Sequence, residues 1–176
     1  KIEKLVGEEY FTEKCKSACY NSVIKSIDFE MESLMAETIQ KAKKTFPDEA
    51  AEFIASAEMK FYKAFKNDEK YISAYKTLAK KVAKDPAKLK NIVNDIIKSN
   101  KDNVKMMADA AEYAGQVYEL KEDLESLNQY CSTLLLSQQI DKALKVATKA
   151  REKAEKDGQE LNPYDGLINF LNSRKS

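Results

Sequence analysis

Two cysteines one helical turn apart are the first residues whose spacing suits chemistry. Cys15 and Cys19 stand four residues apart in EKCKSACYN, so a helix would place both thiols on one face. That spacing fits half of a metal site, but the chain has only one further cysteine and no histidine to complete it. The CxxC spacing of thioredoxin-type redox motifs is also absent. Because Phe11 and Val23 extend the same stripe, we interpret both thiols as small core residues, with a redox or ligand role as the alternative.

The usual catalytic groups are missing. Without histidine the chain has no imidazole base and no Ser-His or Cys-His pair. The four glycines are isolated, so they form no phosphate-binding loop. Carboxylates are abundant, but pairs such as Glu37–Lys41 and Glu152–Lys156 have the i, i+4 order of solvated helix faces. We therefore expect no catalytic residue, no metal, no cofactor and no enzyme activity in this chain.

The composition is that of a folded helical protein. Of the 176 residues 43% are hydrophobic and 34% charged, with four glycines and three prolines. The net charge is +1, and only Arg151 and Arg174 among the 30 basic residues are arginines, so we expect no nucleic-acid binding. No stretch approaches the ~18 apolar residues of a membrane helix, so we expect no membrane insertion. The chain begins at Lys1, which we interpret as a mature product or an excised fragment.

The elements that position these residues are expected to be helices. Apolar residues recur every three or four positions without convincing period-two alternation, which predicts an all-α protein of about nine helices. Pro47 is predicted to restart a helix after a turn, and Asn67 or Asp68 to cap the next one. Asp85 is predicted to cap a helix that has Pro86 in its first position.

The second half of the chain shows similar signals. Residues 99–103 are predicted to separate two helices, and Gly158 to end a third. Asn162 is predicted to cap the last helix, with Pro163 in its first position. This last helix is expected to bury Tyr164, Leu167 and Leu171. Short loops between the helices predict stacked antiparallel pairs in a single domain, residues 1–176.

A stripe of alanines runs along the helix expected after residue 140. Ala143, Ala147 and Ala150 lie on one face, where a core usually has leucine. Small side chains let a second helix come close, so we predict a helix–helix contact there. Ala74 lies 69 residues before Ala143, about twice the ~34-residue period of tetratricopeptide repeats, and is expected to have the same packing role.

The segment SLNQYCSTLLLSQQIDKALKVATKA, residues 126–150, resembles one tetratricopeptide unit. Its first helix would carry Leu127, Tyr130, Cys131 and Leu134. Cys131 stands where the motif usually has glycine, so its small size explains its presence. The resemblance implies stacked hairpins in a right-handed α–α superhelix. It covers about three units, with N-terminal helices before them and a capping helix after them: residues 52–156, 1–50 and 160–176.

Stacked helical hairpins form a continuous concave surface. In this frame the first helices turn lysine, amide and hydroxyl side chains toward the groove: Lys60, Lys63, Lys90, Asn94, Asn128 and Ser132. This mixture suits a peptide or a carboxylate-bearing tail, while plain solvated faces are the alternative. The leading hypothesis is a non-catalytic module that binds a protein or peptide, with a second copy of the chain as a further candidate partner.

The order of segments also resembles the helical region that follows a thioredoxin-like domain in certain secreted bacterial thioredoxin-family proteins. The segments are KVAKDPAKLKNIV, an alanine-rich helix, and SLNQYCSTLLLSQQIDKALKVATKAREKAEKDG. In those proteins the redox cysteines lie in the upstream domain. The resemblance therefore implies an accessory C-terminal domain of a thiol-disulfide protein, in a secreted or periplasmic location. Without that resemblance we expect a cytoplasmic protein.

Overall fold

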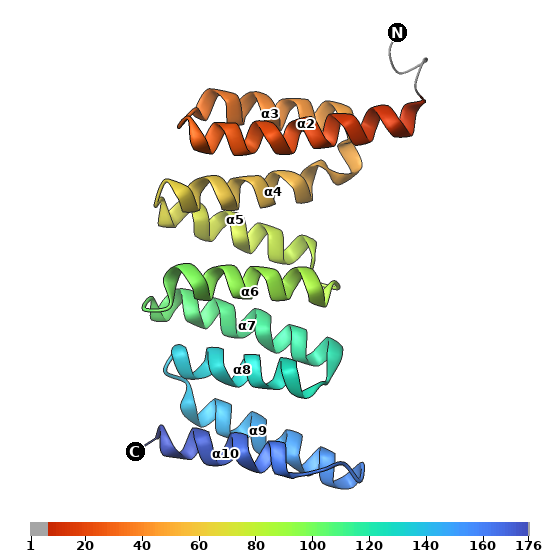
Figure 1. Cartoon of the computed structure of the whole chain (residues 1–176). Coiled ribbons are helices and arrows are strands. Elements are labelled where there is room, and N and C mark those ends of the chain that lie inside the picture. Colours follow the sequence, from red (N-terminus) through yellow and green to blue (C-terminus); the bar gives the residue numbers. More distant parts are fainter. Residues whose placement is uncertain (1–6, 176) are drawn as a thin grey trace. The chain divides into compact units, whose positions relative to one another are not determined.

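The computed structural model describes residues 7–175, and this part of the chain is built from helices alone (Figure 1). Nine helices hold 84% of the described residues, which include no strand. In chain order they are α2 (Glu8–Asp28), α3 (Glu32–Thr45), α4 (Pro47–Ala64), α5 (Asp68–Lys81), α6 (Pro86–Asn100), α7 (Val104–Lys121), α8 (Leu124–Leu136), α9 (Ile140–Lys156) and α10 (Asn162–Ser173). The all-α prediction is confirmed.

The chain divides into two compact units, Lys1–Lys81 and Val82–Ser176. The first contains α2 to α5, and the second contains α6 to α10. Within each unit consecutive helices pack against one another, as expected for stacked helical pairs. A single domain over the whole chain stays a prediction.

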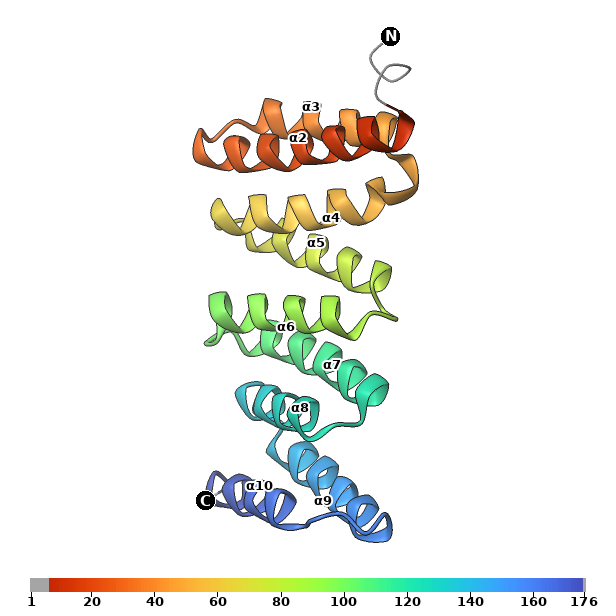
Figure 2. The same cartoon turned by 45° about the vertical axis from the view of Figure 1, so that its right-hand side comes forward.

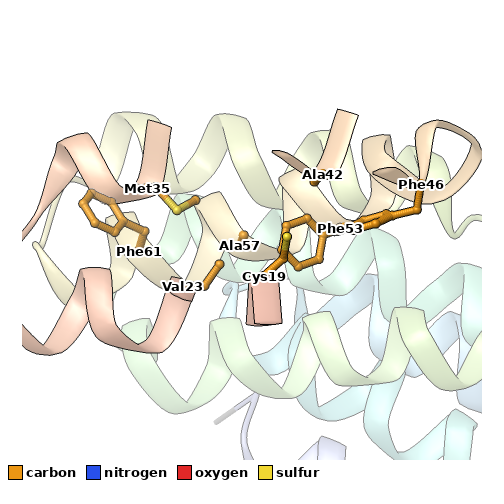
Figure 3. Close-up of a cluster of buried hydrophobic side chains, with 8 residues drawn as sticks. All are labelled: Cys19, Val23, Met35, Ala42, Phe46, Phe53, Ala57 and Phe61. Atoms are coloured by element: carbon orange, nitrogen blue, oxygen red, sulfur yellow. The ribbon is translucent and has the colours of Figure 1, made fainter. Parts of the chain in front are cut away.

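The core of the first unit lies between α2, α3 and α4. Figure 3 shows eight of its buried side chains: Cys19, Val23, Met35, Ala42, Phe46, Phe53, Ala57 and Phe61. The rings of Phe46 and Phe53 meet edge to face with centroids 5.3 Å apart, a favoured aromatic geometry. The predicted stripe on α2 is buried at Cys19 and Val23 and only half-buried at Phe11 and Cys15, because the first turns of the helix are less covered.

Helix starts in the first unit follow local side-chain chemistry. Pro47 occupies the beginning of α4, where its missing N–H leaves no hydrogen bond unmade. Of the two predicted caps before α5, Asn67 is the residue in place, since its side-chain oxygen accepts from the main-chain N–H of Lys70 at 3.1 Å. Both predicted helix starts are therefore confirmed.

The second unit stacks α6, α7, α8, α9 and α10 in chain order (Figure 2). Helix α10 also contacts α8. Asp85 caps α6 as predicted, because its carboxylate accepts from the main-chain N–H groups of Ala87 and Lys88, both at 3.0 Å. Asn103 caps α7 and Asp123 caps α8 in the same way. These caps satisfy N–H groups that have no partner inside the helix.

The predicted cap of the last helix is wrong. Asn162 is the first residue of α10, and the capping position belongs to Leu161, whose backbone is already helical. The helix starts earlier because the Leu161 carbonyl accepts from the N–H groups of Tyr164 and Asp165, both at 3.0 Å. The Asn162 amide instead donates to the carboxylate of Glu160.

The predicted burial along α10 is correct at one of three positions. Leu171 is fully buried in the core of the second unit, whereas Tyr164 and Leu167 are half-buried at its edge. In this unit the same core includes the alanine stripe of α9.

Candidate functional site

The alanine stripe of α9 faces inward. Ala143 and Ala147 have no exposed surface, and Ala150 is 7% exposed. Opposite them on α8, the thiol of Cys131 donates to the main-chain oxygen of Ala143 at 3.7 Å. In the first unit, Ala74 of α5 is likewise buried. Small residues therefore stand at buried positions where helices pack, and the assignment of these positions to repeat units stays a prediction.

The six residues predicted to line one groove fall into different units. Lys60 and Lys63 lie on α4 of the first unit, where Lys60 is exposed and Lys63 half-buried. The other four lie in the second unit, on α6 and α8: Lys90, Asn94, Asn128 and Ser132. The candidate site therefore lies in the second unit alone.

Two side-chain pairs connect α6 to α8. The ammonium group of Lys90 pairs with the carboxylate of Glu125 at 2.5 Å. One turn further along both helices, the Gln129 amide donates to the side-chain oxygen of Asn94 at 2.7 Å. The two residues of each pair are 35 positions apart in the sequence, so the second pair lies four residues after the first on both helices. We call these four residues, together with Asn128 and Ser132, the α6–α8 polar row.

The hydrogen-bonding groups of the polar row are mainly amides and a hydroxyl, because its two charged residues are paired with each other. Glu125 neutralises Lys90, which is therefore a weaker anchor for a carboxylate than the sequence predicts. Asn128 and Ser132 are exposed one turn apart on α8, so they share a helix face. Among the described residues, the side-chain oxygen of Gln129 is buried without a hydrogen-bond partner. Such an unpaired acceptor costs about 1–3 kcal/mol, which a suitable donor would recover.

Glu125 and Gln129 are the members of the row that the sequence analysis missed. Each lies 35 residues after its partner, Lys90 for Glu125 and Asn94 for Gln129. Their partners are long-range neighbours, so helical periodicity within one segment does not reveal them.

The cysteine pair on α2 has the environment of a core. Cys19 is buried, Cys15 is half-buried, and both are free thiols. Burial is the main cause that raises the pKa of the Cys19 thiol; the neighbouring Cys15 raises this pKa further, and Lys41 lowers it. A raised pKa lowers the thiolate fraction, and the thiolate is both the nucleophile and the metal ligand. These observations favour the core interpretation over a redox or ligand role.

Other features of the described residues add no further reactive site. In residues 7–175, His, Cys, Asp and Glu never gather in a group of three that could hold a metal ion. No helix in this range is both long and apolar enough to cross a bilayer. A shallow, open hollow lies at the turn between α6 and α7, lined by residues 98–105. All of its lining comes from one continuous segment, so it brings no distant groups together.

Comparison with known proteins identifies no relative. None of the protein-family models matches the chain. A search of curated proteins also returns no match. The resemblances to tetratricopeptide repeats and to the helical region of thioredoxin-family proteins therefore stay expectations from the sequence.

Proposed function

We propose that the protein is a helical interaction module that binds a peptide segment of another protein along the α6–α8 polar row. The observation that carries this proposal is the pairing of Lys90 with Glu125 and of Asn94 with Gln129, which aligns two helix faces in register. Beside these pairs, Asn128 and Ser132 project from α8 as exposed hydrogen-bonding groups. The proposal assigns the chain no reaction of its own.

The chemistry of the row suits a peptide main chain. Side-chain amides both donate and accept hydrogen bonds, as does each peptide unit of an extended segment. The buried oxygen of Gln129 needs a donor, and a rotation of its side chain would let a peptide N–H supply one. Because Lys90 is already paired with Glu125, we expect recognition of main-chain polar groups more than of a carboxylate-bearing tail.

A tetratricopeptide-like arrangement is part of the proposal. It is supported by the 35-residue interval of both pairs, close to the ~34 residues of that repeat class. It is also supported by the contact of Cys131 with Ala143 between α8 and α9. Stacks of this kind use their aligned helix faces for binding.

Selection from a displayed library of random peptides tests the proposal. Peptides enriched on the wild-type chain are titrated against the double variant Asn128→Ala, Ser132→Ala. The matched control is Asn169→Ala, Ser173→Ala, which removes the same side-chain types from exposed i, i+4 positions of α10. We expect at least about a tenfold rise in Kd for the α8 variant, or ~1.4 kcal/mol, and little change for the control. Equal losses in both, or no enriched peptide, would refute the assignment.

A further inference from the structure

The turn between α2 and α3 alternates acidic with large apolar residues. Residues 28–32 read Asp-Phe-Glu-Met-Glu, and all five are exposed. Phe29 is 69% exposed and Met31 44%. Outer faces of terminal elements in helical stacks are normally polar, because exposed apolar side chains promote association. We call residues 28–32 the acidic tip.

The backbone of the acidic tip is tied down. Glu30 has φ of 55°, a left-handed conformation that glycine usually takes at the end of a helix. The N–H of Met31 donates to the carbonyl of Ser26 at 2.8 Å, and the N–H of Glu30 donates to Ile27 at 3.3 Å. These bonds form the standard double closure of a helix end. Phe29 and Met31 are thereby held outward on a defined turn.

The second unit presents a surface of the opposite charge. Arg174 lies over the ring of Phe170, 5.3 Å from its centroid, at the end of α10. Lys175 pairs with Asp141 at 2.6 Å, which joins this end of α10 to the first turn of α9 (Figure 2). Phe170 is 45% exposed, and Leu136, at the end of α8 shortly before α9, is 38% exposed. We call the exposed residues at the end of α8, the start of α9 and the end of α10 the basic end: Leu136, Lys142, Phe170 and Arg174.

The charges of the two surfaces are complementary. In the acidic tip three carboxylates face solvent, and the basic residue in the last turn of α2 is Lys25. In the basic end the charge of Asp141 is balanced by Lys175, which leaves Lys142 and Arg174 as the exposed cations among its described residues. Each surface also carries exposed apolar side chains. Two copies of the same surface would repel, whereas one of each attracts.

We propose that the acidic tip of one molecule docks on the basic end of a second copy. Contact between two different patches of identical chains leaves one tip and one end of each molecule able to bind a further copy, so it forms an open series or a closed ring. The inference goes beyond the proposed function, because it concerns other residues and does not depend on the α6–α8 polar row.

Sedimentation velocity with paired charge reversals tests the proposal. The tip variant is Asp28→Lys, Glu30→Lys, and the end variant is Lys142→Glu, Arg174→Glu. For the wild type at low salt, we expect the weight-average sedimentation coefficient to rise with concentration and added salt to reverse this rise. Each variant alone is expected to stay monomeric, because its two surfaces then carry the same sign. An equimolar mixture of the two is expected to associate again, since each variant supplies the surface that the other lacks.

Charge-matched controls separate docking from a general effect of net charge. The control for the tip variant is Glu119→Lys, Glu152→Lys, and the control for the end variant is Lys98→Glu, Lys105→Glu. Each makes the same change of net charge at other exposed positions, and both should associate like the wild type. Circular dichroism checks that every variant keeps its helical content. A wild type that stays monomeric at all concentrations overturns the proposal. So does a mixture that stays monomeric, or a control that loses association as the tip variant does.

Discussion

The thiol of Cys131 on α8 donates to the main-chain oxygen of Ala143 on α9 across 3.7 Å. Both residues are completely buried. A side chain as short as that of cysteine reaches the backbone of a neighbouring helix only where the two helices pack closely, and small residues between them allow this. The alanine stripe of α9 therefore has a packing role that leucine could not fill.

Enlarging one alanine should strain this contact. Ala147 is fully buried, so Ala147→Leu adds three carbons to a filled space, which typically costs about 1–3 kcal/mol. Lys145, on the same helix, is exposed, and Lys145→Leu should change stability by no more than about 0.5 kcal/mol. Both replacements introduce the same good helix former, so helix propensity does not explain a difference. Urea denaturation compares the variants, and equal midpoints would contradict the packing assignment.

The three thiols should differ in reactivity. Burial raises the pKa of the Cys131 thiol to about 12, so almost no thiolate forms near pH 8. We expect an alkylating reagent followed by mass spectrometry to label half-buried Cys15 first and Cys19 more slowly. Cys131 should react only when the protein unfolds, and labelling in denaturant provides the reference rates. Labelling of native Cys131 as fast as Cys15 would show that α8 and α9 separate readily.

Local signals in the sequence predict the starts of α4, α5 and α6. The carboxylate of Asp85 and the amide of Asn67 cap the helices they precede, because a cap needs only the next two or three residues. The same rule fails at Asn162, where the chain at Leu161 already turns into the helix. The residue type of Asn162 does not reveal that the chain already turns into the helix one residue earlier.

The candidate site is predicted less completely. The sequence places Asn94 and Asn128 on helix faces of one stack, and in the structure both lie on helices of the second unit. It does not predict the partners Glu125 and Gln129, because a pair between two helices depends on their relative rotation and offset. It also does not predict that Phe29 is exposed, because a large apolar residue next to a helix end is usually expected to be buried.

Glu58 should make stability depend on pH. Burial raises the pKa of this half-buried carboxyl group on α4, while the weaker effects of Lys43 and Lys70 lower it. The folded state therefore holds this proton more tightly than the unfolded state. The free energy of unfolding then falls as pH rises from the ordinary carboxyl pKa of about 4.3 through the raised folded pKa. Below this pH range Glu58 is protonated and burying it costs no charge penalty; above the range the buried carboxylate lowers the free energy of unfolding by the full amount.

Replacing Glu58 with glutamine removes the titrating group. We expect Glu58→Gln to raise the free energy of unfolding at pH 7 and to lose most of this gain near pH 4. Glu37→Gln, at an exposed position of α3, is the control and should show no comparable gain. Urea denaturation at both pH values measures the difference. A gain of the same size at pH 4 and pH 7 would show that burial of charge is not the cause.

Gly115 and Gly166 are both helical glycines, but their surroundings differ. A Cβ atom on Gly115 of α7 would lie 3.0 Å from Cζ and 3.2 Å from Cε2 of Tyr130 on α8. A Cβ atom on Gly166 of α10 would meet nothing within 4 Å. Replacing an unhindered helical glycine with alanine gains about 0.8–1.0 kcal/mol. We therefore expect Gly166→Ala to stabilise the protein by roughly that amount.

At Gly115 the same substitution should have the opposite sign. The Tyr130 ring packs beside Tyr118, with centroids 6.5 Å apart, so a movement of the ring would disturb this contact. We expect Gly115→Ala to destabilise the protein by about 1 kcal/mol, because overpacking outweighs helix propensity. In a Tyr130→Ala background the obstruction is gone and the propensity gain should reappear. Urea denaturation of the four proteins in this double-mutant cycle measures the coupling, expected at about 1–3 kcal/mol. A coupling near zero would mean that Gly115 does not set the approach of α7 and α8, because the ring then yields to the new methyl group without cost.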